Sequence, residues 1–191
     1  GLYHLFGISV GVERIAIAIA GLAIVLSAFL IGRALRSSAT GLWAALIVAT
    51  APRVVFFSRR ILIDVGLTAF MSLALACFVL AERHPEQRRR WLLLMYVALG
   101  LGVLTKGPVA IVLPALACVI WLVWERRLAD LKRLLIVPGV LIIAVIVVPW
   151  IAAVTGRWGA EPFWAFIGVE NLERYRSAMT GERPFWFLLT V

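Results

Sequence analysis

The chain of 191 residues is 63% apolar and only 15% charged, with a mean hydropathy of +1.02 and a formal net charge of +9. Typical soluble domains are about 45–50% apolar and about 25% charged, so the composition excludes a soluble globular domain, a disordered tail and a nucleic-acid-binding module. The 17 Arg and 2 Lys lie between apolar runs rather than in one solvated basic stripe. This pattern is typical of a membrane protein.

Long apolar stretches predict six transmembrane helices, near residues 15–32, 37–57, 64–81, 91–105, 107–124 and 134–155. A helix needs about 20 residues to cross about 30 Å of hydrocarbon, so the shorter stretches must include flanking residues or be shielded by neighbouring helices. The alternative is the buried core of a soluble helical protein, but six such stretches leave too little polar surface to cover them. We therefore expect an all-α, polytopic helical bundle over residues 1–156.

Three basic connecting segments predict the orientation, because Lys and Arg are retained on the cytoplasmic side of membranes. These segments hold ten of the 19 cations, namely Arg33, Arg36, Arg83, Arg88, Arg89, Arg90, Arg126, Arg127, Lys132 and Arg133. Their alternation along the chain places the segment around residues 58–64, the turn at Lys106 and everything after Gly156 on the outer side.

Lys106 is the sharpest single candidate, because it lies between two apolar stretches and is followed at once by Gly107 and Pro108. A lone ammonium between two spans needs a partner. In one interpretation it extends to the outer membrane interface and has no further role. In the other, the turn holds it at the mouth of an outward cavity, where it faces a phosphate or a carboxylate.

The segment SRRILID holds Arg59, Arg60 and Asp64. Arg60 and Asp64 are four residues apart, a spacing that lets them pair on one helical face. Asp64 also opens the next predicted span, where an acid is a good helix cap. The alternatives are that Asp64 caps the helix and binds Arg60, or that its carboxylate orients an arginine or a substrate hydroxyl at the outer face.

After Gly156 the sequence mixes aromatic and charged residues and contains no long apolar run. This composition predicts an outer-face amphipathic segment over residues 157–183, followed by the start of a further span over 184–191. Near-helical spacing turns Glu170, Asn171 and Arg174 toward a cavity. The alternative is a surface helix without catalytic meaning, in which Glu170 and Arg174 form an ion pair.

Other potentially reactive side chains give weaker signals. Cys77 and Cys118 lie in the middle of predicted spans, where packing is the simplest role. His4 and His84 have no ligand partner at a usable spacing, so no zinc signature exists. The sequence also contains no phosphate-cradling glycine loop, dinucleotide fingerprint or nucleophile elbow.

Four segments carry a family resemblance, in the order LFGISVGVERIAIAIAGLAIVLSAFLIGRAL, SRRILIDVGLTAFM, GLGVLTKGP and GVENLERY. In content, order and spacing they resemble the membrane glycosyltransferases that use polyprenyl-phosphate sugars. These are the aminoarabinose transferases of lipid A and the wider dolichyl-phosphate-mannose protein mannosyltransferase family, glycosyltransferase family 39. The resemblance implies a GT-C type bundle with an outward-facing cavity. It also implies transfer of a sugar from a polyprenyl-phosphate carrier to a lipid, glycan or protein acceptor, with inversion.

The resemblance further implies roles for the outer-face residues. Lys106 and Arg174 are expected to stabilise negative charge that develops on the lipid phosphate. Asp64 is expected to structure the same pocket, with Arg59 or Arg60 as helpers.

Glu170 and Asn171 occupy the acid and Asn/His places of the family's Glu-Asn/His-x-x-Arg signature. Because asparagine is a poorer metal ligand than histidine, no metal ligand is assigned in this chain, and a divalent metal is an expectation for the full-length protein only. The family's catalytic carboxylate is expected before Gly1. We therefore expect a fragment cut at both ends, inactive by itself, with no catalytic residue assigned.

The resemblance, together with the preference for Arg over Lys, implies a multi-pass protein of a bacterial inner membrane whose site faces the periplasm. The implied partners are the polyprenyl-phosphate sugar, the bilayer and the acceptor, with no nucleic acid. Two alternatives are a transporter or flippase of an anionic lipid-linked substrate and a non-catalytic scaffold. A transporter is expected to show ionisable residues at mid-span or an internal repeat, and neither is evident.

Overall fold

The computed structural model describes residues 10–60, 62–159 and 161, and within them the chain forms helices and no strand. The principal helices are α2 (Val10–Leu35), α3 (Ser38–Thr50), α4 (Pro52–Phe57), α5 (Ile63–Arg83), α6 (Arg88–Lys106), α7 (Val109–Trp124) and α8 (Ile136–Trp158). Two short 3₁₀ helices, η1 (Pro85–Gln87) and η2 (Leu128–Leu134), lie in the connections. The chain divides into two units, Gly1–Val148 and Pro149–Val191, and the division falls at the proline inside α8.

Three of the described helices are long and apolar enough to cross a membrane, namely Gly11–Leu35, Ile63–Arg83 and Ile136–Trp158. Large apolar side chains such as Leu22, Trp43 and Val145 are exposed on their surfaces and on the surface of α3. Exposed apolar surface of this extent belongs in lipid rather than in water. The prediction of an all-α membrane bundle is therefore confirmed.

The stretch expected to form one span over residues 37–57 forms two helices instead. The N–H of Thr40 donates to Ser37 Oγ and caps the start of α3. α3 ends at Thr50, Ala51 is extended with φ −61° and ψ 121°, and Pro52 begins α4. Proline lacks a backbone N–H and disfavours the helical conformation in the residue before it, which explains the break.

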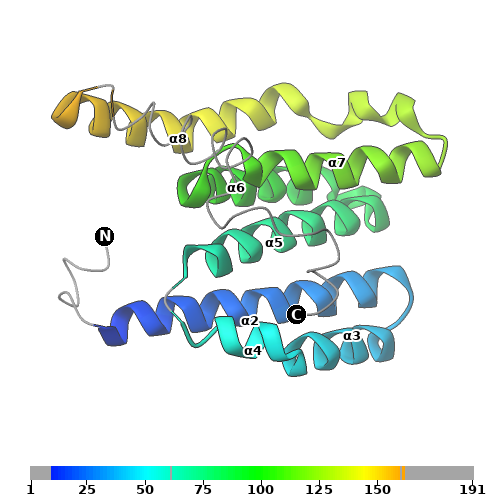
Figure 1. Cartoon of the computed structure of the whole chain (residues 1–191). Coiled ribbons are helices and arrows are strands. Elements are labelled where there is room, and N and C mark those ends of the chain that lie inside the picture. The colour runs from blue at the N-terminus through cyan, green and yellow to red at the C-terminus, as the bar shows by residue number, and fades with distance from the viewer. Residues whose placement is uncertain (1–9, 61, 160, 162–191) are drawn as a thin grey trace, which may run out of the picture. The chain divides into compact units, whose positions relative to one another are not determined.

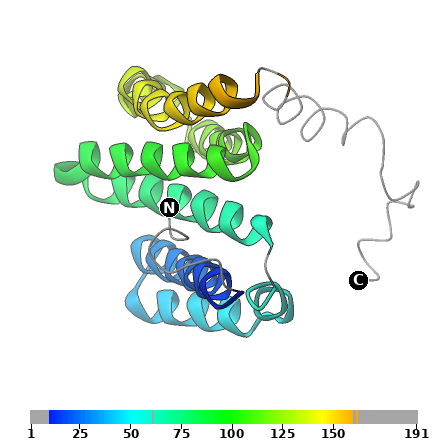
Figure 2. The same ribbon diagram turned by 90° about the vertical axis from the view of Figure 1, so that its left-hand side faces the viewer.

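Within the first unit, α5 packs against α2, α6 and α7, while α3 returns along α2 (Figures 1 and 2). Small residues allow close approach: a methyl group on Gly41 of α3 would lie 2.6 Å from the carbonyl oxygen of Phe29 in α2. The core joins α5, α6 and α7, and its buried members include Ala74, Phe78, Ala81, Leu92, Met95, Leu99, Cys118 and Leu122. Packing of small against large apolar residues therefore fixes how α5 and α6 run beside each other.

Tyr96 of α6 contacts the residues at the beginning of α8 and just before it. Its hydroxyl donates a hydrogen bond of 2.9 Å to the backbone oxygen of Leu134, and both residues are buried. Its ring lies directly against Gly139, where an added methyl group would overlap ring atoms. Only glycine fits this contact without a shift of the aromatic ring.

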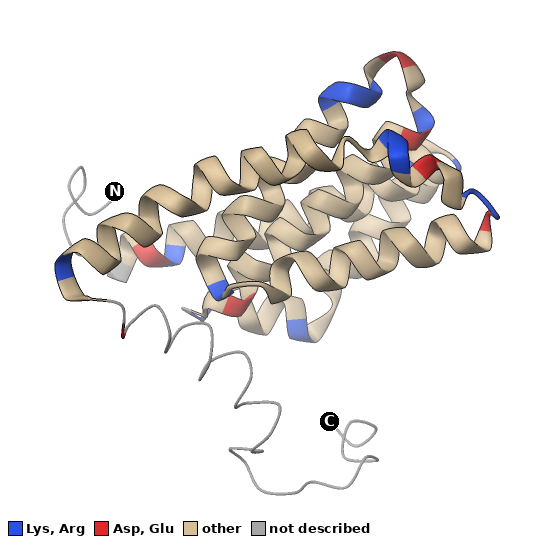
Figure 3. Ribbon diagram, turned by 90° about the horizontal axis from the view of Figure 1, so that it is seen from above, with Lys and Arg blue, Asp and Glu red and all other residues tan. Residues whose placement is uncertain are grey.

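Charged residues of the first unit gather at two opposite ends of the bundle (Figure 3). One end, termed the basic end, is formed by the last turns of α2, α5 and α7, the first turn of α6, and η2. The other, termed the Lys106 end, is formed by the start of α2, α4, the start of α5 and the turn between α6 and α7.

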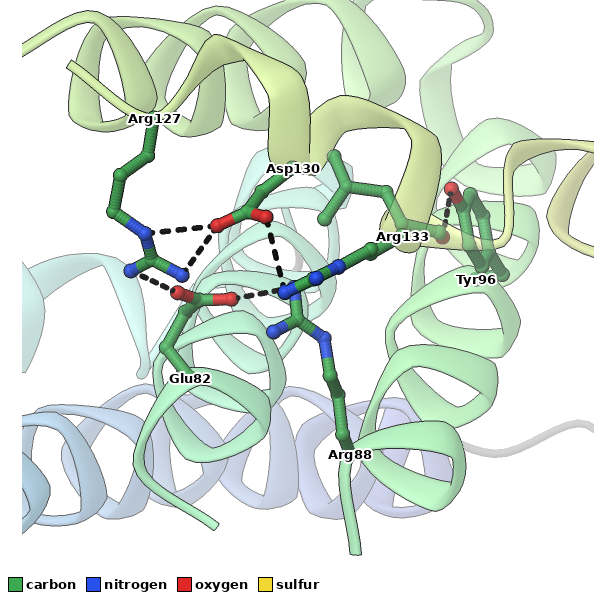
Figure 4. A network of polar contacts seen from close by, with 7 residues as sticks. Glu82, Arg88, Tyr96, Arg127, Asp130 and Arg133 are labelled. Carbon is green, nitrogen blue, oxygen red and sulfur yellow. Dashed lines mark hydrogen bonds and ion pairs between the residues drawn. The ribbon is translucent and has the colours of Figure 1, made fainter. Parts of the chain in front are cut away.

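A network of ion pairs holds the basic end together (Figure 4). Glu82 Oε2 accepts a hydrogen bond of 2.8 Å from Arg127 Nη1, and Glu82 Oε1 lies 2.8 Å from Arg88 Nη2. The second contact is an attraction between charges, because its alignment does not meet hydrogen-bond geometry. Asp130 pairs with both Arg127 and Arg133. The network connects α5, α6 and the segment that follows α7.

Candidate functional site

The end of α6 determines the position of Lys106. It is the last residue of α6, and the Gly107 that follows has a φ of +86°. Residues other than glycine rarely adopt this backbone conformation, and Pro108 cannot donate a backbone hydrogen bond to continue the helix. The ammonium therefore lies at a helix C-terminus, where the helix dipole favours positive charge.

Asp64 of α5 is the partner of Lys106. Lys106 Nζ donates to Asp64 Oδ1 across 42 residues of sequence, which links the end of α6 to the start of α5. The Asp64 side chain is 61% exposed and the Lys106 side chain 31% exposed. An ion pair exposed to this degree contributes about 0.2–1 kcal/mol, so a phosphate can join it or replace the carboxylate at small cost.

A cavity of about 330 Å³ opens beside this ion pair, and we term it the polar cavity. Its polar lining residues are Arg53 of α4, Ser58, and Asp64 and Thr68 of α5, and apolar residues of α2, α4 and α5 complete it. The Thr68 hydroxyl donates a hydrogen bond of 2.8 Å to the backbone oxygen of Asp64, so Thr68 lies one helical turn after Asp64 in α5. Most of the exposed lining is apolar, and the hydroxyl, carboxylate and guanidinium groups supply the few polar contacts that orient a ligand.

An apolar groove of about 550 Å³ lies between α2, α5 and α6. Its lining residues include Ala20, Ile63, Gly66, Phe70, Leu104 and Thr105. Ile63 and Thr105 directly precede Asp64 and Lys106 in the chain, so the groove reaches the residues next to the ion pair. The Lys106–Asp64 pair therefore lies where an apolar groove and a polar cavity approach each other.

Arg59 and Arg60 are exposed after α4, and neither pairs with Asp64 in the part of the chain that the structure describes. The Arg60 guanidinium lies over the Phe56 ring, 4.3 Å from its centroid. The hypothesis of an Arg60–Asp64 pair is wrong because α5 begins only at Ile63, so the two residues do not share a helix. The N-cap of α5 is Leu62, and Asp64 lies inside the first turn.

Three predicted site residues, Glu170, Asn171 and Arg174, lie outside the described residues, as does most of the 157–183 segment. Their convergence on Lys106 stays a prediction. Among residues 10–60 and 62–159, no group of three or more His, Cys, Asp or Glu is arranged to hold a metal ion.

Sequence reasoning missed the contribution of Ser58 and Thr68 to the polar cavity. One signal was available in principle, because Gly21 of α2 allows the segment after α4 to approach closely. A methyl group on Gly21 would lie 2.5 Å from Ser58 Oγ. That close approach brings Ser58 against α2, which forms one wall of the cavity.

The fold and its lipid-compatible exterior define a helical membrane protein of the GT-C type. The chain belongs to the family described as dolichyl-phosphate-mannose-protein mannosyltransferase, whose sequence profile matches residues 6–160. The membership predicted from its motifs is thereby confirmed.

Individual relatives agree with this assignment. The chain is 31% identical over 191 residues to the undecaprenyl phosphate-alpha-4-amino-4-deoxy-L-arabinose arabinosyl transferase of Pseudomonas paraeruginosa, covering 97% of this chain and 33% of the relative. It is 32% identical over 157 residues to the transferase of the same name from Erwinia tasmaniensis, covering 78% of this chain and 27% of the relative. The chain thus spans about a third or less of the length of these relatives.

A solved structure matches almost the entire chain. The crystal structure of ArnT from Cupriavidus metallidurans bound to undecaprenyl phosphate superposes with a TM-score of 0.86 at 30% identity. The match covers 98% of this chain and 35% of that one. This chain therefore has the same GT-C fold as about one third of the larger ArnT protein.

Proposed function

We propose that this chain supplies the donor-binding part of a membrane glycosyltransferase that moves a sugar from a polyprenyl-phosphate carrier to a lipid, glycan or protein acceptor. The observation that carries the proposal is the Lys106–Asp64 pair, which lies next to both the apolar groove and the polar cavity. A polyprenyl-phosphate sugar has three matching parts: an apolar chain, an anionic phosphate and a polyhydroxylated head. The relatives' names, and the undecaprenyl phosphate in the solved ArnT structure, support the same donor.

In the proposed complex, the polyprenyl chain lies along Phe70 and Leu104 of the apolar groove, and the phosphate contacts Lys106 Nζ. During transfer, an acceptor oxygen forms a bond to the anomeric carbon while the bond from that carbon to the phosphate oxygen breaks. The bonding electrons stay with the polyprenyl phosphate, whose increased negative charge the Lys106 ammonium stabilises. Attack from the face opposite the leaving phosphate inverts the anomeric configuration.

The proton of the acceptor hydroxyl passes to a base, which we expect to come from another part of the full-length protein. Asp64 is assigned to positioning, because it holds the Lys106 ammonium until the phosphate arrives. Arg174, Glu170 and Asn171 are proposed to join the same site from the segment after α8, with Arg59 and Arg60 at its exposed edge.

The charge distribution supports an orientation with the basic end in the cytoplasm and the Lys106 end in the periplasm of a bacterial inner membrane. We assign six spans to this part of the protein, with 157–183 as an outer amphipathic segment and 184–191 as the beginning of another span. The relatives' names favour 4-amino-4-deoxy-L-arabinose as the sugar. We propose lipid A as the acceptor on the family resemblance alone.

The test uses the full-length protein in membranes, with a polyprenyl-phosphate sugar as donor. Lys106→Ala and Arg174→Ala are expected to lower the rate of sugar transfer at least ten-fold, since each removes a cation from the leaving phosphate. Lys132→Ala is the matched control, because Lys132 is the second of two lysines and lies at the basic end. Wild-type rates in Lys106→Ala and Arg174→Ala would overturn the phosphate assignment.

A further inference from the structure

The basic end carries a second hollow, which the proposed transferase site does not use. Its volume is about 530 Å³, and we term it the arginine hollow. Residues at the ends of three helices line it, including Arg33 and Ala34 of α2, Leu80, Arg83 and His84 at the end of α5, and Trp91 of α6. It lies at the opposite end of α5 from the polar cavity.

Arg33 and Arg83 differ from Arg88, Arg127 and Arg133 of the basic end in their surroundings. Arg88 and Arg127 pair with Glu82, and Arg127 and Arg133 pair with Asp130. By contrast, no carboxylate in the part of the chain covered by the structure forms an ion pair with either arginine of the hollow. Two cations from two different helices thus converge on one hollow without a protein anion between them.

The position of each arginine in a last helical turn has a simple cause, since positive charge there compensates the helix dipole. The helix dipole explains why each helix ends in a cation, but it does not explain why the two arginines line a shared hollow. The remaining walls are largely apolar and include Leu30, Leu80 and the ring of Trp91. A cationic rim above apolar walls matches an amphiphile with an anionic head.

We infer that the arginine hollow binds the phosphate of an anionic phospholipid from the leaflet at the basic end. Arginine presents a planar fork that binds two phosphate oxygens at once. Basic pockets between transmembrane helices on the cytoplasmic side are suited to anionic headgroups, and tryptophan is enriched at the same membrane depth. A free phosphate ion offers the same oxygens but no acyl chain to cover Leu30 and Leu80, so the lipid fits the hollow better.

Occupation of the hollow connects α2 to α5 and α6 at the end where the Glu82 network does not reach α2. A ligand that binds the folded state alone stabilises it by mass action. The bound lipid therefore raises the thermal stability of the protein, independently of any sugar transfer at the Lys106 end.

The experiment uses the full-length protein in detergent after removal of co-purified lipid. Native mass spectrometry and thermal stability are measured with phosphatidylglycerol, with phosphatidylcholine, and with sodium phosphate as the third arm. The test variant is Arg33→Gln with Arg83→Gln. The control is Arg36→Gln with Lys132→Gln, which removes two positive charges from the same end at residues that do not line the hollow.

Phosphatidylglycerol is expected to bind the wild type and the control more tightly than phosphatidylcholine, and to stabilise both. Each arginine that contacts the phosphate is expected to contribute about five-fold in affinity, which corresponds to about 1 kcal/mol, so the test variant is expected to bind about thirty-fold more weakly. Ala34→Trp fills the hollow and is expected to weaken binding with both arginines present. This variant decides the matter if the double arginine variant fails to fold.

Three results would overturn the inference. One is equal phosphatidylglycerol affinity in the test variant, in Ala34→Trp and in the control. Another is equal affinity of the wild type for phosphatidylglycerol and phosphatidylcholine. The third is binding of inorganic phosphate without binding of either lipid, which would assign the hollow to a free ion.

Discussion

Glu82→Gln is predicted to destabilise the basic end by about 2–3 kcal/mol. The Glu82 side chain is 7% exposed and lies 2.8 Å from a nitrogen of each of Arg88 and Arg127. Breaking a buried ion pair by removing one partner costs about 3–5 kcal/mol, and losing a hydrogen bond to a charged group costs about 1.5–3 kcal/mol. Two features reduce the sum: Arg127 is 42% exposed and keeps Asp130, and the glutamine retains one acceptor oxygen.

The assay heats the full-length protein in detergent and measures the temperature at which half of it is no longer monodisperse. Glu82→Gln is expected to lower that temperature by a few degrees. Glu86→Gln in the nearby η1 is the matched control, because the Glu86 side chain is 64% exposed and lies 3.5 Å from His84. The reasoning is refuted if the two variants unfold at the same temperature.

Two further predictions concern stability. The hydrogen bond from Arg127 holds the pKa of Asp130 below its ordinary value, so Asp130 contributes stability that is present above about pH 4 and is lost as the pH falls through the lowered pKa. Thermal stability measured from pH 7 to pH 3 is expected to fall more steeply in the wild type than in Asp130→Asn. Gly139→Ala is expected to destabilise by about 1–3 kcal/mol through overlap with the Tyr96 ring, whereas Gly156→Ala, with no atom within 4 Å of the new methyl group, is expected to be neutral or stabilising by up to about 1 kcal/mol. Equal melting temperatures for the two glycine variants would contradict the described packing.

The helical membrane fold could be predicted because its cause is local. Long charge-free stretches such as those that form α2 and α5 have one stable conformation in lipid, where unpaired backbone groups are costly. The break between α3 and α4 was missed because apolar length alone does not register Pro52, although the residue itself carries the signal. Composition therefore predicted the class of fold better than the limits of its elements.

The position of Lys106 at the end of a helix is also a local property, set by the Gly107–Pro108 pair. Its partner could not be assigned from sequence, because 42 residues separate Lys106 from Asp64. Sequence spacing offered Arg60 as one partner of Asp64, and this alternative is wrong because α5 begins only at Ile63, so the two residues do not share a helix. Spacing along the sequence does not predict contacts that form when α5 packs on α6.

The cavities depend even more on tertiary structure. The polar cavity exists because the segment that ends α4 approaches α2, where Ser58 lies against Gly21. The basic-end network likewise joins Glu82 to Arg127 across 45 residues. The sequence predicted that this end is basic, but it did not reveal which arginines are neutralised by acids and which face the arginine hollow.

The account depends most directly on where the polyprenyl phosphate binds. Its affinity for the full-length protein can be measured in detergent for the wild type, Lys106→Ala and Lys132→Ala, with no acceptor present. We predict an affinity about ten-fold lower for Lys106→Ala, corresponding to about 1.4 kcal/mol, and an unchanged affinity for Lys132→Ala. An equal affinity in all three proteins, or a loss confined to Lys132→Ala, would contradict a phosphate site at the Lys106 end.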